Sequence, residues 1–238
     1  MLNALSGHRG IFSSFEEGWA VARRTGLPGH DGWAEIAIHL RLSENLRPSD
    51  YAALFWLSRL SERGVKVFDY GGNFGNLFYT YKKYLEPLGP LDWTVLDLPF
   101  VLQEGRRIAR ERNATGLRFA ESAAEFSVDR VLLASGFLHY WEGTIEGFVR
   151  QFPVSPTHIL INRSPMIENQ AAFITVQNTG TCAHPCVVRN AASMIAEFSA
   201  LGYELVDRWI APELHVYMPF FPNLSIPHYS GFYLRLQN

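Results

Sequence analysis

The sequence predicts an α/β domain with an open, mostly parallel sheet, preceded by an N-terminal helical segment. Two patterns indicate this fold class. From residue 65 onward, short apolar runs alternate with helical stretches, as expected for the strand–helix units of a parallel sheet. The last two strand-like runs have no helix between them, so we expect an antiparallel pair at the end of the sheet. With 238 residues, 47% of them apolar, the chain can form a large core.

The start of the chain carries helical patterns. Its three candidate helices are residues 15–22, 31–42 and 48–60. A segment this short makes a poor core alone, because small domains bury too little apolar surface. We therefore expect residues 1–62 to form a helical cap over a domain of residues 63–238.

The rest of the chain supplies the sheet. Residues 130–135 are almost wholly apolar, as expected for a central parallel strand buried on both faces. Residues 163–190 show no clear period. The predicted strands are residues 65–69, 93–98, 117–120, 130–135, 158–162, 203–209 and 232–236, and the predicted helices are residues 76–85, 102–112, 145–151 and 191–201.

Composition excludes several classes of protein. The near-balanced charge, 21 Lys and Arg against 23 Asp and Glu, argues against a nucleic-acid-binding surface. No run approaches the roughly 20 apolar residues of a membrane span, and the first 11 residues lack a signal-peptide core. Two cysteines cannot form a disulfide scaffold, so we expect a reducing, cytoplasmic location. The expected partner is a small-molecule or sugar-type ligand, and a homodimer is compatible with the sequence.

The most informative segment joins the first predicted strand of the sheet to its first helix. It reads Asp69-Tyr70-Gly71-Gly72-Asn73-Phe74-Gly75. Glycines let a ligand approach the backbone closely, and the following helix presents free N–H groups. A dinucleotide loop would read Gly-x-Gly-x-x-Gly, which this segment does not. Asparagine tolerates the left-handed conformation, so Asn73 can take a turn position that glycine often fills.

Further polar residues follow the next strands. Asp97 ends the second strand, where an acidic residue can bind both ribose hydroxyls of a nucleoside cofactor or cap the next helix. Glu121 and Ser122 follow the third strand, where they could meet an adenine amine or form a solvated turn. Ser135 ends the fourth strand and precedes an aromatic segment. Because the loops at the carboxyl ends of parallel strands form the ligand crevice, these residues are candidate binding residues.

With these motifs, the chain resembles class I S-adenosyl-L-methionine (SAM) methyltransferases. The glycine loop is similar to their motif Asp/Glu-x-Gly-x-Gly-x-Gly, with Asn73 at the middle glycine. The resemblance is to a subfamily encoded among bacterial polysaccharide and O-antigen genes, and it covers nearly the whole chain. It also rests on Trp93 with Asp97, Leu133-Ala134-Ser135, Leu138-His139-Tyr140, Ile161-Asn162-Arg163-Ser164-Pro165 and Thr175-Val176-Gln177. The subfamily often has Gln at the position of His139 and Asp at that of Asn162.

The resemblance implies a Rossmann-like fold with a mostly parallel seven-stranded sheet and an antiparallel C-terminal strand. It also implies SAM as the cofactor and a role in polysaccharide biosynthesis. The residues that it assigns to the cofactor are Asp69, Gly71, Gly72, Asn73, Gly75, Asp97, Leu98, Glu121, Ser122 and Ser135.

The predicted activity is methyl transfer from SAM to an oxygen of a small or glycan-type acceptor. Residues 163–185 are too long for a mere connection, so we expect Arg163 and Gln177 to bind the acceptor, together with Tyr140. An internal ion pair is the alternative for Arg163. His139 and His184 are the candidate proton acceptors, because a neutral imidazole is a competent base near pH 7, although both could be structural.

Two other functions stay open. An NAD(P)-dependent sugar oxidoreductase would need a dinucleotide loop, and the Tyr and Lys residues of segment 79–83 lie in the first predicted helix of the sheet domain. A methyltransferase-like domain that only binds a partner would not need Asp97 and an intact glycine loop. No metal is expected, because Cys182 and Cys186 lack the spacing of a zinc site.

Overall fold

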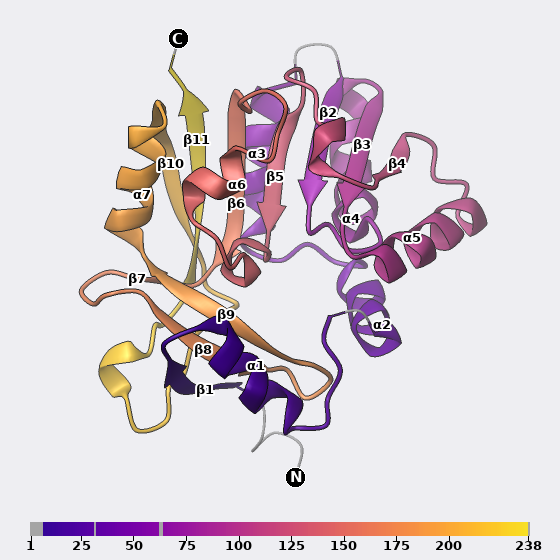
Figure 1. The fold of residues 1–238 in the computed structure, drawn as a ribbon. Coiled ribbons are helices and arrows are strands. Elements are labelled where there is room, and N and C mark those ends of the chain that lie inside the picture. The colour runs from indigo at the N-terminus through magenta and orange to yellow at the C-terminus, as the bar shows by residue number, and fades with distance from the viewer. Residues whose placement is uncertain (1–6, 31, 62–63, 238) are drawn as a thin grey trace.

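A seven-stranded sheet forms the body of the protein. The computed structural model describes residues 7–30, 32–61 and 64–237 (Figure 1). The strand order is β10-β11-β6-β5-β2-β3-β4. Of these strands, β11 runs antiparallel to both neighbours, and the other neighbouring pairs are parallel. The strands are β2 (Val65–Tyr70), β3 (Leu91–Leu96), β4 (Leu117–Ala120), β5 (Val131–Ser135), β6 (His158–Ser164), β10 (Tyr203–Ala211) and β11 (Tyr229–Leu236). The predicted fold class and its strands are confirmed.

Helices cover both faces of this sheet. One core cluster joins it to α3 (Asp50–Arg59), α4 (Asn76–Leu85) and α5 (Pro99–Glu111), and the other joins it to α6 (Ile145–Val149) and α7 (Ala191–Ala200). Successive residues of β2 alternate between them, since Val67 belongs to the first cluster and Phe68 to the second. Burial on both faces explains why the central strands are continuous apolar runs.

A second, four-stranded sheet was not predicted. Its order is β1-β8-β9-β7, and helix α1 (Phe15–Arg23) packs on it, at the bottom of Figure 1. The prediction of helix throughout the start of the chain is therefore wrong for β1, and the unpatterned segment 163–190 contains three strands. The strands are β1 (Gly7–Phe12), β7 (Met166–Ile167), β8 (Phe173–Asn178) and β9 (Ala183–Asn190).

Two features of these strands explain why the sequence pattern did not predict the small sheet. In β1, Gly7 and Gly10 have φ of 121° and 72°, and the register with β8 shifts between Arg9 and Phe12. Such a bulge interrupts the two-residue alternation of a strand. In β9, four consecutive residues from Pro185 to Val188 are buried, so no polar face marks the strand.

Elements near the start of the chain belong to both parts of the molecule, the small sheet and the domain built on the large sheet. The predicted helices are present as α1, α2 (Trp33–Leu42) and α3. While β1 and α1 belong to the small sheet, Ile36 of α2 packs with Phe74 and Ile108 near the glycine loop. Of the helices in the described ranges, none is long and apolar enough to cross a membrane.

Candidate functional site

A cavity of about 740 Å³ lies at the carboxyl ends of the central parallel strands. Its wall includes the loops that follow β2, β3, β4 and β5, together with residues of β8 and β9. This edge is where open α/β sheets bind ligands. Of the residues predicted as functional, the cavity is lined by Gly71, Gly72, Asn73, Asp97, Leu98, Glu121, Ser122, Ser135, His139, Tyr140, Arg163, Gln177 and His184.

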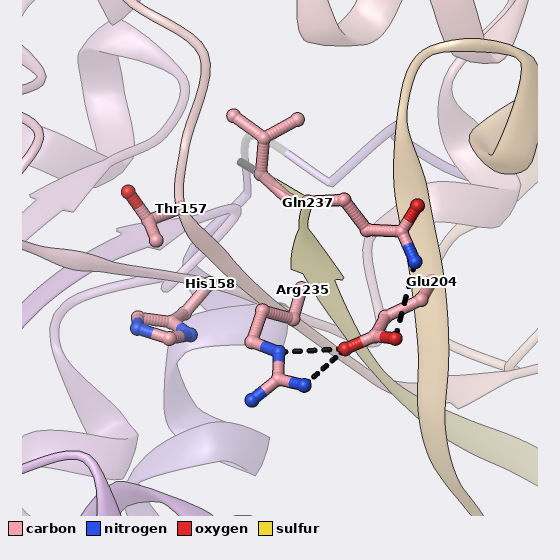
Figure 2. A pocket seen from close by; sticks show the side chains of 6 residues that line it. Thr157, His158, Glu204, Arg235 and Gln237 are labelled. Atoms are coloured by element: carbon pink, nitrogen blue, oxygen red, sulfur yellow. Dashed lines mark hydrogen bonds and ion pairs between the residues drawn. The ribbon is translucent and has the colours of Figure 1, made fainter.

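A second hollow of about 590 Å³ lies where β6 begins and β11 ends (Figure 2). Arg235 Nε donates to Glu204 Oε1 at 2.7 Å there, so the charged groups of this hollow are already paired with each other. The amino end of a parallel strand is not the ligand edge of an α/β sheet. The larger cavity is therefore the candidate site.

The glycine loop at the end of β2 has a conformation that requires its sequence. Gly71 has a φ of 73°, and a Cβ there would lie 2.6 Å from the Phe137 ring. A Cβ on Gly72 would lie 2.5 Å from the Asp69 carboxyl group. Asn73 has a φ of 53°, the left-handed conformation that the sequence allowed it. Both glycines line the cavity, and a side chain at either position would collide with its neighbours.

Asp69 lies beneath this loop. Its side chain is fully buried, and Oδ2 accepts a hydrogen bond from Trp93 Nε1 at 3.0 Å, whereas Oδ1 has no partner among the described residues. Burial raises the pKa of this carboxyl group to about 7. Asp69 and Gly75 do not line the cavity; Gly75 begins α4 and packs against Leu117. Asp69 and Gly75 therefore contact the protein interior and support the conformation of the glycine loop.

Asp97 joins the loops that follow β2 and β3. Its Oδ2 accepts a hydrogen bond from the Asn73 N–H, and its Oδ1 accepts one from the Leu98 N–H, both at 2.7 Å. Burial raises the pKa of this carboxyl group despite the two N–H donors, which lower it. Each carboxylate oxygen has a second lone pair, so the group can still accept hydrogen bonds from ligand hydroxyls.

Glu121 and Ser122 lie at an exposed part of the cavity wall. Glu121 Oε1 accepts a hydrogen bond from Arg106 of α5 at 2.9 Å. Its other carboxylate oxygen remains open to a donor such as an exocyclic amine.

The two candidate bases belong to different parts of the fold. His139 follows β5 of the large sheet, and His184 lies in β9 of the small sheet. His139 is 4% exposed in a short helical turn (Leu138–Tyr140), and its Nδ1 has no hydrogen-bond partner in the described part of the chain. Burial lowers the pKa of His139 well below its usual value, so the ring is neutral near pH 7. In β9, His184 Nδ1 lies 2.7 Å from the Pro185 carbonyl oxygen. Since a carbonyl oxygen only accepts, Nδ1 carries the proton and Nε2 is the basic nitrogen of the neutral ring.

Aromatic rings surround His184. Its ring centroid lies 4.2 Å from that of Trp19, 4.9 Å from that of His30 and 5.1 Å from that of Tyr140. The Tyr140 hydroxyl donates to Gln177 Oε1. Three residues that the sequence offered separately are thus neighbours, because β8 and β9 pair beside the turn that carries Tyr140.

Arg163 is buried at the end of β6, with a φ of 55°. It forms an ion pair with Asp50, and its guanidinium also donates to Ser49 and Ser135. The internal pairing that the sequence left open for Arg163 is therefore present, although this side chain also lines the cavity.

Sequence reasoning missed many cavity residues, above all those from the start of the chain. They carry no motif, and tertiary packing alone brings them to the cavity. They include His30, Ile38, His39, Leu42, Arg47, Asn76, Gln151, Thr179, Leu214 and Tyr229. Cys182 and Cys186 are free and buried, and the described residues contain no group of three His, Cys, Asp or Glu arranged to hold a metal ion.

Comparison with known proteins identifies the fold. No protein-family profile matches the chain, and no curated protein matches it either. Among solved structures it is similar to Burkholderia thailandensis 1,6-didemethyltoxoflavin-N1-methyltransferase, determined with 1,6-didemethyltoxoflavin and S-adenosylhomocysteine (TM-score 0.56, 15% identity, 96% of this chain and 93% of that one).

Two further structures share this architecture. The glycopeptide N-methyltransferase MtfA, complexed with SAM, gives a TM-score of 0.53 at 12% identity over 81% of this chain and 96% of that one. Magnesium protoporphyrin IX methyltransferase from Synechocystis, with bound S-adenosylhomocysteine, gives 0.51 at 13% identity over 94% and 95%. The chain therefore has the fold of class I SAM-dependent methyltransferases, and those relatives bind SAM or its product.

Proposed function

We propose that this protein is a SAM-dependent methyltransferase that methylates an oxygen of a small-molecule or glycan-type acceptor. The observation that carries the proposal is the junction of the glycine loop and Asp97. There the Asn73 N–H donates to the Asp97 carboxylate beside an open cavity. A carboxylate held in this way, next to glycines that leave the backbone bare, fits the ribose and thioether parts of a nucleoside cofactor.

The residues that would hold SAM divide by chemistry. Asp97 would accept the ribose hydroxyls, Glu121 or Ser122 would meet the adenine amine, and the backbone of Gly71 and Gly72 would contact the amino-acid end. The cavity volume is in the range of known cofactor sites, which is roughly 300–1,000 Å³. When bound, SAM supplies a methyl group already activated by the sulfonium charge.

This chain's own contribution is alignment and removal of the acceptor proton. His139 lines the cavity just beyond the end of β5 and is neutral near pH 7, so it is the first choice as proton acceptor. His184 is the second, through Nε2. Tyr140 and Gln177 would orient a hydroxyl-bearing acceptor, because their hydroxyl and amide groups match the donors and acceptors of a sugar. A base is needed at oxygen since a hydroxyl must lose its proton as the new bond forms.

The experiment that tests this proposal is titration calorimetry with SAM, S-adenosylhomocysteine and NADH. Micromolar binding of the first two without NADH binding supports a methyltransferase. NADH binding alone would instead favour the oxidoreductase. Binding of SAM without methylation of any acceptor, in a screen of sugar nucleotides and phenols with labelled methyl groups, would favour a binding domain.

The cap function is part of the same proposal. Residues 1–62 would cover the cavity of the domain formed by residues 63–238, since His30, His39 and Arg47 contribute to its wall. Hydrogen exchange measures this directly: the amides of α2 should exchange more slowly when S-adenosylhomocysteine is bound, while those of α7 should not change. Unchanged exchange in α2 would contradict the cap.

A further inference from the structure

Arg163 is the centre of a buried hydrogen-bond network. Its Nε donates to Ser49 Oγ at 3.0 Å, and its Nη2 forms the ion pair with Asp50. The Ser49 hydroxyl in turn donates to Glu213. Asp50 Oδ1 also accepts from the Tyr81 hydroxyl at 2.5 Å. The network therefore holds the guanidinium through Nε and Nη2.

The remaining contact of this guanidinium reaches the cavity wall. Arg163 Nη1 lies 3.2 Å from Ser135 Oγ at the end of β5. A guanidinium has no acceptor atom, so Ser135 Oγ must accept this hydrogen bond and its own hydrogen must point elsewhere. Within the described part of the chain, no acceptor is recorded for that hydrogen. Ser135 is half-buried and lines the cavity, so its hydroxyl is available to donate to a ligand there.

The cationic Arg163 bonded to Ser135 favours an anionic ligand atom there, while Asp50 and Glu213 pair with its other nitrogens. Arg163 polarises the Ser135 hydroxyl, which strengthens it as a donor. Arg47 lines the same cavity, and its pKa is lowered to about 10, first by burial and then by the nearby charge of Arg163. Carboxylate oxygens are the preferred partners of such donors.

We propose that Arg163 is a positioning residue that turns the Ser135 hydroxyl into a hydrogen-bond donor for the carboxylate at the amino-acid end of SAM. This inference rests on the proposed function and adds a residue pair that holds the charged end of the cofactor. It gives Arg163 an indirect role, exerted through Ser135, in place of direct contact with the acceptor.

The test is calorimetry with two probes that differ in this end of the molecule. S-adenosylhomocysteine has the carboxylate, whereas 5′-methylthioadenosine lacks the whole amino-acid end. Ser135→Ala should weaken binding of S-adenosylhomocysteine roughly tenfold, as expected for loss of a hydrogen bond to a charged group. Binding of 5′-methylthioadenosine should stay within twofold, and Ser135→Thr, which retains the hydroxyl, should restore most of the affinity. Ser58→Ala, which removes a hydroxyl of α3 that donates to the Phe55 carbonyl, is the matched control.

The role of Arg163 is tested by a double-mutant cycle. Arg163→Lys should weaken S-adenosylhomocysteine as much as Ser135→Ala does, and the double variant should lose no more, because both changes remove one hydrogen bond. Equal losses for both probes, or an unchanged affinity in Ser135→Ala, would overturn the inference. Additive losses in the double variant would overturn the positioning role. Failure of the unmodified protein to bind S-adenosylhomocysteine would overturn the proposed function itself. The Ser135 variants keep the test decisive should Arg163→Lys not fold.

Discussion

The two parts of the cavity are built in opposite ways. The part proposed for the cofactor comes from consecutive strand–loop units between Tyr70 and Phe137, all in the large sheet. The part proposed for the acceptor combines His30, Gln177 and His184 with residues near both ends of the chain. The first depends on backbone conformation, which local sequence encodes. The second also depends on contacts between segments far apart in the chain, such as those of His30 and Tyr140 with His184, which local sequence does not encode.

Burial acts on the charges of the two parts with opposite signs. It raises the pKa of the carboxyl groups of Asp69 and Asp97, because a charge is costly away from water. It lowers the pKa of the His139 imidazole well below its usual value. His139 is therefore neutral near pH 7, whereas burial favours the protonated form of Asp69 and Asp97.

The largest expected effect is a loss of turnover without a loss of cofactor affinity, caused by removing the general base. His139→Ala should lower kcat by roughly 10²–10⁴, the usual contribution of a general base, with unchanged affinity for S-adenosylhomocysteine. His184→Ala is the rival variant, and His158→Ala, at the amino end of β6, is the control. A loss below tenfold in both cavity variants would mean that neither is the base. Activity of His139→Gln, the side chain common in the similar subfamily, would also contradict the assignment.

The next largest expected effect is a loss of SAM affinity caused by a change at Asp97, in the cofactor part of the cavity. Asp97→Ala removes the carboxylate that accepts from Asn73 and that we propose to accept from the ribose, which should cost about 1.5–3 kcal/mol of SAM binding. Calorimetry measures this loss directly. Asp97→Asn keeps an acceptor oxygen and should lose less. An affinity within twofold of the unmodified protein in both variants would move the ribose site elsewhere.

Asp69 should impose a pH dependence on stability. Its folded pKa of about 7 lies above the unfolded value of 3.8, so between these values the folded state holds a proton that the unfolded state has lost. Stability should fall as pH rises through this range, by at most about 1.4 kcal/mol per pH unit. In Asp69→Asn, which cannot titrate, urea denaturation at pH 4 to 7 should show a flatter profile. An identical profile in the two proteins would show that the Asp69 pKa is not raised.

The features that the sequence could predict are those encoded locally, and those it could not predict depend on contacts between distant segments. The loop from Asp69 to Gly75 and the strand ending before Asp97 were located because each needs particular residues at fixed spacing. By contrast, β1 was missed, since Gly7 and Gly10 interrupt it and its partner β8 lies about 165 residues away in the chain, as Thr175 and Arg9 illustrate. Arg163 was predicted to bind a substrate; only the fold reveals Asp50 beside it.

The smallest expected effect comes from two similar hydrogen bonds, since each part of the cavity contains one between a tyrosine and a glutamine. Removing each bond in turn compares the cofactor part with the acceptor part directly. Tyr70 donates to Gln151 Oε1 at 3.0 Å in the cofactor part, and Tyr140 donates to Gln177 Oε1 in the acceptor part. Loss of one neutral hydrogen bond costs about 0.5–1.5 kcal/mol, which corresponds to roughly a two- to tenfold change.

Gln177→Ala should therefore raise the KM for the acceptor by this factor and leave the KM for SAM unchanged. Gln151→Ala should do the reverse. Tyr140→Phe should match Gln177→Ala, and the double variant should be no worse, since the two side chains share one bond. Steady-state kinetics with each substrate varied in turn measures all four variants. If Gln177→Ala raised the KM for SAM instead, the division of the cavity into two parts would be wrong, because the residue would then contact the cofactor from the small sheet.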